Sequence, residues 1–124
     1  MSRIAFVVKM RPIGVNHAYV PARWGSRHGM RMTEIGHAYK ATVHAAARRA
    51  MRGRAFLEGS LAATIRFFYP DNRSDIDGAI KPTLDAMQGA VYANDRAVRL
   101  LREVAYCVDR ERPRVEIEVA EITP

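Results

Sequence analysis

The chain has 124 residues, of which 48% are apolar, which suits one compact domain with its own core and is too short for two domains of ordinary size. Its single cysteine, Cys107, excludes an internal disulfide, and the lack of a His/Cys cluster at ligand spacing argues against a structural zinc site. The apolar stretches are short and interrupted by charges, so we expect a cytoplasmic protein with no membrane-spanning segment and no secretory signal.

The formal net charge of +7 is concentrated in the first part of the chain. Residues 1–54 hold eleven Lys or Arg and one acidic residue, whereas residues 55–124 hold nine Lys or Arg and twelve acidic residues. Basic side chains strengthen association with a polyanion because they release its condensed counterions. The asymmetry favours nucleic acid as a partner, and a merely soluble basic protein is the alternative that charge alone leaves open.

The first half of the chain predicts a strand, a long irregular segment and a helix. Residues 3–10 are rich in Val, Ile and Phe and predict a buried strand. Residues 11–32 contain several Gly and Pro residues, which is typical of a functional loop and leaves room for a loose hairpin. Thr33 offers a helix start, and apolar residues recur at helical spacing from there to Gly53.

The next segment predicts a strand that leads into a second helix. Residues 59–69 are rich in β-forming residues, and Pro70 ends the run. The helix is expected to run from residue 77 or 78 to Gln88. Pro82 fits this helix only if it lies in or beside the first turn, where backbone donors lack partners anyway.

Two further strands are predicted at residues 98–108 and 114–122, joined by a polar turn, and we expect them to pair antiparallel. In the second of these, alternating Val, Ile and Glu residues indicate one packed face and one wet face. The predicted fold is therefore a single small α/β (α+β) domain over residues 1–124, with about four strands packed against two helices.

The most informative motif is a group of aspartates between Asp71 and Asp95. Asp75 and Asp77 are two residues apart, so an extended backbone directs both carboxylates to the same side. Hard ions such as Mg2+ take oxygen ligands and are usually held by one or two carboxylates together with substrate phosphate oxygens. The motif therefore predicts a divalent-metal site, which Asp95, on a short polar loop after the second helix, is placed to complete.

A simpler role for either Asp75 or Asp77 alone is to cap the second helix. Acids gathered beside a basic surface repel one another, however, and a metal relieves that repulsion, so ligation is the favoured interpretation. Lys81 lies four residues after Asp77, one turn along the predicted helix, where its ammonium would meet a phosphate or the departing oxygen. Asp85 lies four residues beyond Lys81 and is interpreted as its ion-pair partner.

Basic residues of the first half are candidates for contact with a phosphate backbone. In the predicted helix, His37, Lys40, His44 and Arg48 share one polar face, which is either a phosphate-binding face or a solvated one. The irregular segment mixes arginines with Trp24, which suits stacking on an unpaired base and equally suits a core anchor. The candidate contacts are Arg11, Arg23, Arg27, Arg31, Lys40 and Arg48.

The combination of Asp75-Ile76-Asp77, Lys81, residues 83–87, Gly89 and Asn94-Asp95 resembles the RusA family of Holliday-junction resolvases. The similarity is centred on residues 70–98 and extends more weakly along the rest of the chain. It implies a small domain with a mixed sheet that forms a homodimer and binds four-way DNA junctions. It further implies paired symmetric nicks with Mg2+, or Mn2+ in its place, in DNA recombination and repair.

The resemblance places the essential aspartates of the family at Asp75, Asp77 and Asp95 and its catalytic lysine at Lys81. Asn16, in the early loop, also matches and joins the candidate DNA contacts. Three positions depart from the family pattern: Gly78 replaces a common Asn, Asn94 replaces a frequent acid, and Ser74 replaces a frequent basic residue. A phosphate contact at the last position would pass to Arg73.

Two other functions are compatible with the same residues. One is a junction-binding protein without nuclease activity, in which the carboxylates cap a helix and tune charge. The other is a metal-dependent nuclease that acts on RNA or on other branched DNA.

Overall fold

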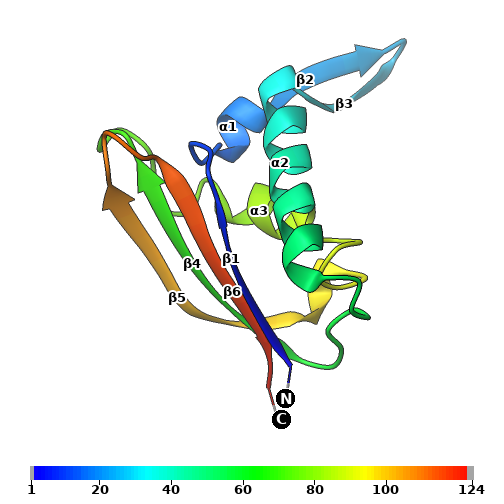
Figure 1. Ribbon diagram of the computed structural model, residues 1–124. Coiled ribbons are helices and arrows are strands. Elements are labelled where there is room, and N and C mark those ends of the chain that lie inside the picture. The colour runs from blue at the N-terminus through cyan, green and yellow to red at the C-terminus, as the bar shows by residue number, and fades with distance from the viewer. Residues whose placement is uncertain (1, 123–124) are drawn as a thin grey trace.

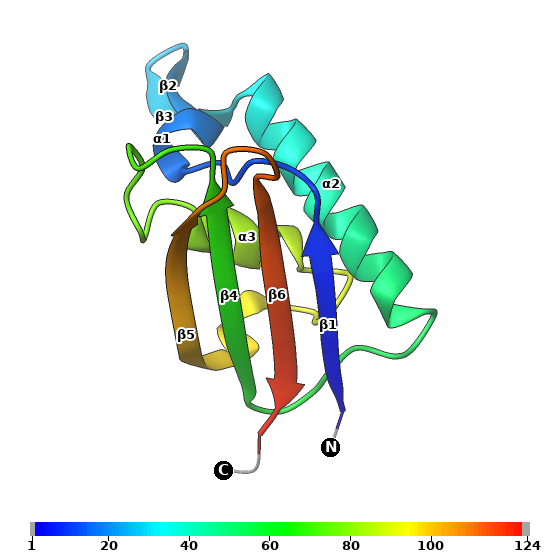
Figure 2. The ribbon, with the colours of Figure 1, turned by 60° about the vertical axis from the view of Figure 1, so that its left-hand side comes forward.

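The computed structural model describes residues 2–122, which form a four-stranded sheet with α2 and α3 on one face and a separate two-stranded hairpin (Figures 1 and 2). The elements in chain order are β1 (Arg3–Val8), α1 (Val15–Ala18), β2 (Tyr19–Trp24), β3 (Arg27–Met32), α2 (Glu34–Met51), β4 (Leu61–Tyr69), α3 (Ile80–Ala86), the 3-10 helix η1 (Asp95–Ala97), β5 (Val98–Val108) and β6 (Arg114–Glu121). The strand order is β1-β6-β4-β5, with β4 and β5 parallel and the other pairs antiparallel. The prediction of a mixed α+β domain is confirmed.

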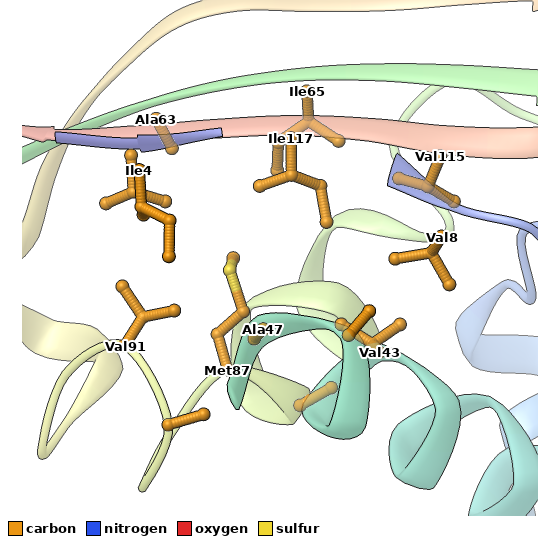
Figure 3. Close-up of a cluster of buried hydrophobic side chains, with 14 of the residues drawn as sticks. Ile4, Val8, Val43, Ala47, Ala63, Ile65, Met87, Val91, Val115 and Ile117 are labelled. Atoms are coloured by element: carbon orange, nitrogen blue, oxygen red, sulfur yellow. The ribbon is translucent and has the colours of Figure 1, made fainter. Parts of the chain in front are cut away.

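The core lies between the sheet and the two helices (Figure 3). The predicted alternation in β6 is confirmed, because Val115, Ile117 and Val119 are buried while their neighbours are partly exposed. Figure 3 shows Val43 and Ala47 of α2 facing the sheet side chains across this core. β1 is an edge strand whose alternate residues are exposed, so the expectation of a buried strand is correct for one face only.

The last two strands do not pair with each other, which corrects the predicted antiparallel pairing. β5 pairs with β4 on one side, and β6 pairs with β4 on the other. The polar loop after β5 crosses the end of β4, where the Asp109 backbone N–H donates to the Tyr69 carbonyl at 2.8 Å. β4 is the most continuously buried strand, so it satisfies the ladder bonds of two neighbours. The parallel pair is reached through α3, as parallel strands require a crossover.

The segment before α2 is more regular than expected. It contains α1 and a hairpin in which six positions of β2 pair with six of β3, from Tyr19 opposite Met32 to Trp24 opposite Arg27. The turn contains Gly25 at φ +63°, a left-handed conformation that glycine adopts without steric cost. Figure 1 shows the hairpin projecting away from the sheet and helices.

The predicted start and end of the first long helix are confirmed. The Thr33 hydroxyl oxygen caps α2 by accepting from the Gly36 backbone N–H at 3.0 Å. The Thr33 hydroxyl also donates to the His17 carbonyl at 2.6 Å, which fastens α1 to the first turn of α2. The helix ends at Met51, and its C-cap residue Arg52 lies in the left-handed region just before Gly53.

Replacing Gly36 with alanine is expected to lower the free energy of unfolding by about 1–3 kcal/mol, the usual cost of overpacking. A Cβ atom at this position would lie 2.9 Å from the Ala18 Cα and 2.5 Å from its carbonyl oxygen, so α1 must shift. Urea denaturation measures the change. Gly78→Ala is the control, because its Cβ would meet backbone atoms at ordinary distances of 3.7 Å or more. A Gly36→Ala protein as stable as the parent would contradict the close packing of α1 on α2.

The second predicted helix is shorter than expected. α3 begins at Ile80 rather than at Asp77 or Gly78, and Pro82 therefore lies in its first turn. The condition set by the proline is met, because the missing N–H of Pro82 would have had no helical partner.

Candidate active site

A surface pocket of about 670 Å³ lies beside Tyr69, the last residue of β4. Its walls come from the segment after β1, from α1, from the start of α2 and from the loop after β4. Five of the residues predicted from the sequence line this one pocket: Arg11, Asn16, Arg73, Asp75 and Asp77. Segments that are about sixty residues apart in the chain therefore bring basic, amide and acidic side chains to one place.

The two carboxylates of the acidic motif are free to bind a ligand. Asp75 and Asp77 are exposed, and within residues 2–122 neither side chain accepts a hydrogen bond or joins an ion pair. β4 ends at Tyr69 as predicted, but the two aspartates lie in an irregular loop rather than on an extended backbone that would direct both carboxylates to one side. Capping does not occupy them either, because the N-cap of α3 is Ala79, without a side-chain bond.

The loop that carries these aspartates is held by hydrogen bonds on both sides of the motif. Before the motif, the Tyr106 hydroxyl donates to the Asp71 carbonyl at 2.9 Å, and its oxygen accepts from the Ser74 backbone N–H at 3.2 Å. After it, the Val15 backbone N–H donates to the Gly78 carbonyl at 2.8 Å. The loop is thereby tied to β5 and to α1. At Gly78, where the family commonly has Asn, the chain lies against the backbone of Gly14.

Tyr69 lines the pocket but was not among the site residues predicted from the sequence. Its ring stacks on Tyr106 with centroids 4.8 Å apart, and within residues 2–122 its buried hydroxyl has no hydrogen-bond partner. Burial, together with the nearby Tyr106 and Asp75, raises the pKa of Tyr69 to about 12 against the opposing charge of Arg11. At neutral pH the phenol is protonated and lines the pocket as a neutral donor. An aromatic residue immediately before the acidic loop was the only sign of it in the sequence.

Lys81, Asp85 and Asp95 form a second cluster, which we call the Lys81 cluster. The Lys81 Nζ lies 3.3 Å from an Asp85 carboxylate oxygen, which confirms the predicted pair. A hydrogen bond that the protonated Asp95 carboxyl donates to the Asp85 carboxylate raises the pKa of Asp95, and burial and repulsion from Asp85 act in the same direction. The charges of Lys81 and Arg96 oppose that rise. Two carboxyl groups therefore lie near one ammonium, which is paired with Asp85.

Asp95 is positioned by its backbone. Its N–H donates to the Gln88 Oε1 at 3.0 Å, and Asn94 caps the short η1 helix by accepting from the Arg96 N–H at 2.9 Å. α3 itself is fastened to α2 by a buried hydrogen bond of 2.7 Å between the Tyr39 and Thr83 hydroxyls. Gln88, Tyr39 and Thr83 thus support the cluster, and sequence reasoning did not assign them these roles.

The structure does not bring all the predicted ligands together. Within residues 2–122, no group of three or more His, Cys, Asp or Glu side chains is arranged to hold a metal ion. Asp75 and Asp77 line the pocket, whereas Asp95 is paired with Asp85 in the Lys81 cluster. The reasoning that placed Lys81 one helical turn after Asp77 is wrong, since α3 begins beyond Asp77. The ligand set and the catalytic role of Lys81 stay predictions.

The remaining candidate DNA contacts are all exposed. Arg23, Arg27 and Arg31 lie on the hairpin, and Lys40 and Arg48 lie on α2.

Two aromatic residues considered with those contacts have clearer roles in the structure. His44 is not part of a solvated face, because its Nδ1–H donates to the Ala86 carbonyl at 3.0 Å and ties α2 to α3. Trp24 is 56% exposed, so it is not a core anchor.

Unpaired carboxylates beside arginines are typical of enzymes that act on phosphate esters, and nucleases are one class of such enzymes. The sequence matches the family described as Endodeoxyribonuclease RusA over residues 11–120. The chain therefore belongs to the RusA endodeoxyribonuclease family. This membership supports endonuclease activity and the binding of junction DNA. A comparison with curated proteins returned no match. None of the helices in the described part of the chain has the length and apolar character to cross a membrane.

Proposed function

We propose that this protein is a metal-dependent, structure-selective endodeoxyribonuclease that resolves four-way junctions by paired symmetric nicks. We propose further that it acts as a homodimer in DNA recombination and repair in the cytoplasm. The observation that carries the proposal is the pocket in which free Asp75 and Asp77 carboxylates lie among Arg11, Asn16 and Arg73. Family membership supports the same reaction class.

The basic side of the pocket would hold the DNA backbone. Arg11 and Arg73 present planar guanidinium groups, which bind phosphate oxygens through paired, charge-assisted hydrogen bonds. The Asn16 amide supplies a further donor. These contacts position a phosphodiester without reading its bases.

The acidic side of the pocket fits a hard divalent ion. Asp75 and Asp77 offer carboxylate oxygens that no other described side chain occupies, and such oxygens are the donors that Mg2+ prefers. We infer that these two residues hold Mg2+, or Mn2+ in its place. We propose Asp95 as the third ligand, although the structure places it beside Asp85 in the Lys81 cluster, so this ligand must approach the other two when the ion binds. The bound ion would supply a nucleophilic water and neutralise charge on the phosphate.

Lys81 would stabilise the departing oxygen. The hydrogen bond to Asp85 raises the pKa of Lys81, so the ammonium stays charged at any pH at which the enzyme works. Asp85 restrains the lysine through an exposed ion pair, which costs little to break when a phosphate arrives. Asp85 is therefore a positioning residue in this scheme, and Lys81 is the group that meets the substrate.

A two-fold symmetric dimer matches a two-fold symmetric junction, because two identical sites address two strands at once. Paired nicks follow from that arrangement without any signal between the sites.

The proposal is tested by incubating the protein with a synthetic four-way junction and with a linear duplex of the same sequence, with and without Mg2+. We expect nicks at symmetric positions in the junction, at least about tenfold faster than any cutting of the duplex, and none after EDTA treatment. Equal cutting of both substrates would contradict structure selectivity. Binding without nicking under both Mg2+ and Mn2+ would contradict the nuclease and favour a non-catalytic junction-binding protein.

A further inference from the structure

The β2–β3 hairpin carries chemistry that the pocket does not use. It projects from the body of the protein at the same end as α1 and the acidic loop in both views (Figures 1 and 2). Residues 19–32 contain Arg23, Arg27 and Arg31 and no acidic residue. The hairpin also exposes two large apolar side chains, Trp24 and Met30, at 56% and 59%. A projecting basic hairpin with an exposed indole suits a partner that carries both negative charge and flat rings on which the indole can stack.

The register of the hairpin sorts these residues onto two faces. Trp24 is paired with Arg27, Ala22 with Gly29, and Val20 with Arg31. Directly paired residues in antiparallel strands share a face, so Trp24, Arg27, Gly29 and Arg31 lie on one face, which we call the Trp24 face. Arg23, His28 and Met30 lie on the other. Arg23 is partly engaged there, because its Nε–H donates to the Gly25 carbonyl at 2.9 Å.

The edge of the Trp24 indole rests against the opposite strand. A Cβ atom on Gly29 would lie 3.0 Å from the Trp24 Cζ3 atom and 3.8 and 4.0 Å from the two ring atoms beside it, so the ring meets the glycine edge-on. The missing side chain of Gly29 gives the indole room there, and Trp24 stays 56% exposed. A side chain with only two rotatable bonds that rests on a strand loses little entropy when a second flat group packs on it.

We propose that the Trp24 face is a stacking platform for an unpaired base of branched or single-stranded DNA. This inference rests on the proposed action on DNA junctions, and it names the part of the substrate that the hairpin recognises. Trp24 stacks on the exposed face of the base, while Arg27 and Arg31 contact the flanking phosphates. Inside a continuous duplex every base face is covered by its neighbours, so the platform binds only where stacking is interrupted.

The hairpin also has the reach to act apart from the pocket. Asn16 and His17 line the pocket, and β2 starts two residues later, at Tyr19. An extended strand rises about 3.3 Å per residue, so Trp24 lies about 17 Å from Tyr19. That distance corresponds to about five nucleotide steps. Trp24 therefore contacts a base several positions from the phosphate in the pocket, and it contributes selectivity rather than chemistry.

The experiment uses the fact that Trp24 is the only tryptophan of the chain. Its fluorescence is recorded without metal during titration with a single-stranded oligonucleotide, a four-way junction and a blunt duplex, and binding is followed separately by the anisotropy of labelled DNA. We expect strong quenching by the first two and little by the duplex. Unchanged fluorescence at saturating anisotropy for the single strand and the junction would overturn the platform. Equal quenching by the duplex would indicate insertion between paired bases and would overturn it as well.

Variants separate stacking from charge and from folding. Trp24→Ala is expected to weaken binding of the single strand and the junction by roughly 5- to 100-fold, the range that base stacking on aromatic residues supports, and to change duplex binding less than about twofold. Trp24→Phe should recover part of the loss. Met30→Ala, equally exposed on the opposite face, should bind as the parent does; a loss as large as that of Trp24→Ala would overturn the assignment.

Failure of this inference and failure of the proposed nuclease are distinguishable. Nicking of the junction without tryptophan quenching removes the platform and leaves the nuclease. Quenching without nicking under Mg2+ or Mn2+ supports the platform and removes the nuclease.

Discussion

Asp75→Asn is expected to reduce junction cleavage by at least about 100-fold while junction binding stays within about twofold of the parent. Even residues behind a metal's direct ligands cost about 10- to 100-fold when they are changed, and a direct ligand costs more. The amide keeps the size of the side chain, so the hydrogen bonds of Tyr106 and Gly78 that hold the loop are unaffected. Binding survives because Arg11 and Arg73 are unchanged and one repulsive negative charge is removed.

Asp71→Asn is the matched control for this experiment. Asp71 lies four residues earlier in the same loop, but its carboxylate accepts the Arg73 backbone N–H at 3.1 Å and does not line the pocket. The asparagine can accept the same bond, so cleavage should remain within a fewfold of the parent. Cleavage rates from gel assays and binding from anisotropy are compared over a range of Mg2+ concentrations. Asp75→Asn protein that cuts at half the parental rate would contradict the role of Asp75 as a ligand.

Asp95→Asn is expected to lower cleavage by about 100-fold or more and, in the absence of metal, to raise the melting temperature at neutral pH. The carboxyl–carboxyl contact with Asp85 raises the pKa of Asp95 in the folded protein. A raised carboxyl pKa means that the folded state binds the proton more tightly than the unfolded chain does. Protonated Asp95 therefore stabilises the fold, and this stabilisation is complete below the ordinary aspartate pKa of about 3.9. It is lost as the pH rises through the pKa that Asp95 has in the folded protein. At neutral pH the repulsion remains, and the amide removes it.

The stability gain from Asp95→Asn should shrink as the pH falls toward 3, because Asp95 is then protonated in both states. Asp109→Asn provides a control of opposite sign. A hydrogen bond from Arg114 lowers the pKa of Asp109, so that carboxylate stabilises the fold above the ordinary aspartate pKa and stops doing so in acid. Its replacement should therefore lower the melting temperature at pH 7. Thermal unfolding at a series of pH values checks both variants. A lower melting temperature for Asp95→Asn at pH 7 would show that attraction to Lys81 outweighs repulsion from Asp85.

Higher stability together with lost cleavage in Asp95→Asn would show that Asp95 destabilises the free protein and is kept for activity. A residue whose removal stabilises the free protein and abolishes activity is one whose charge is needed by a ligand rather than by the fold. Mg2+ should then raise the melting temperature of the parent more than that of Asp95→Asn, because an ion that binds only the folded state stabilises it by mass action. This measurement tests the third ligand without relying on cleavage.

The sequence by itself determined the local features of this protein. The Thr33 cap of the long helix is predictable because it involves only the Thr33 hydroxyl and a backbone N–H three residues later. Pro82 marks the first turn of α3 for the equally local reason that it lacks an N–H. The alternation of β6 and the spacing of the acidic motif are of the same kind, and the motif led to the correct family.

Only the tertiary structure decided which of these parts meet. β5 and β6 follow one another in the chain, yet both pair with β4, because strand partners are chosen by burial across the whole sheet rather than by the connecting turn. The same long-range packing gathered Arg11 and Asn16 with Asp75 and Asp77 and set Asp95 beside Asp85. It also placed Tyr69 in the pocket wall. Residue spacing predicts interactions between residues that are close in the sequence, whereas contacts between distant segments depend on how the whole hydrophobic core packs.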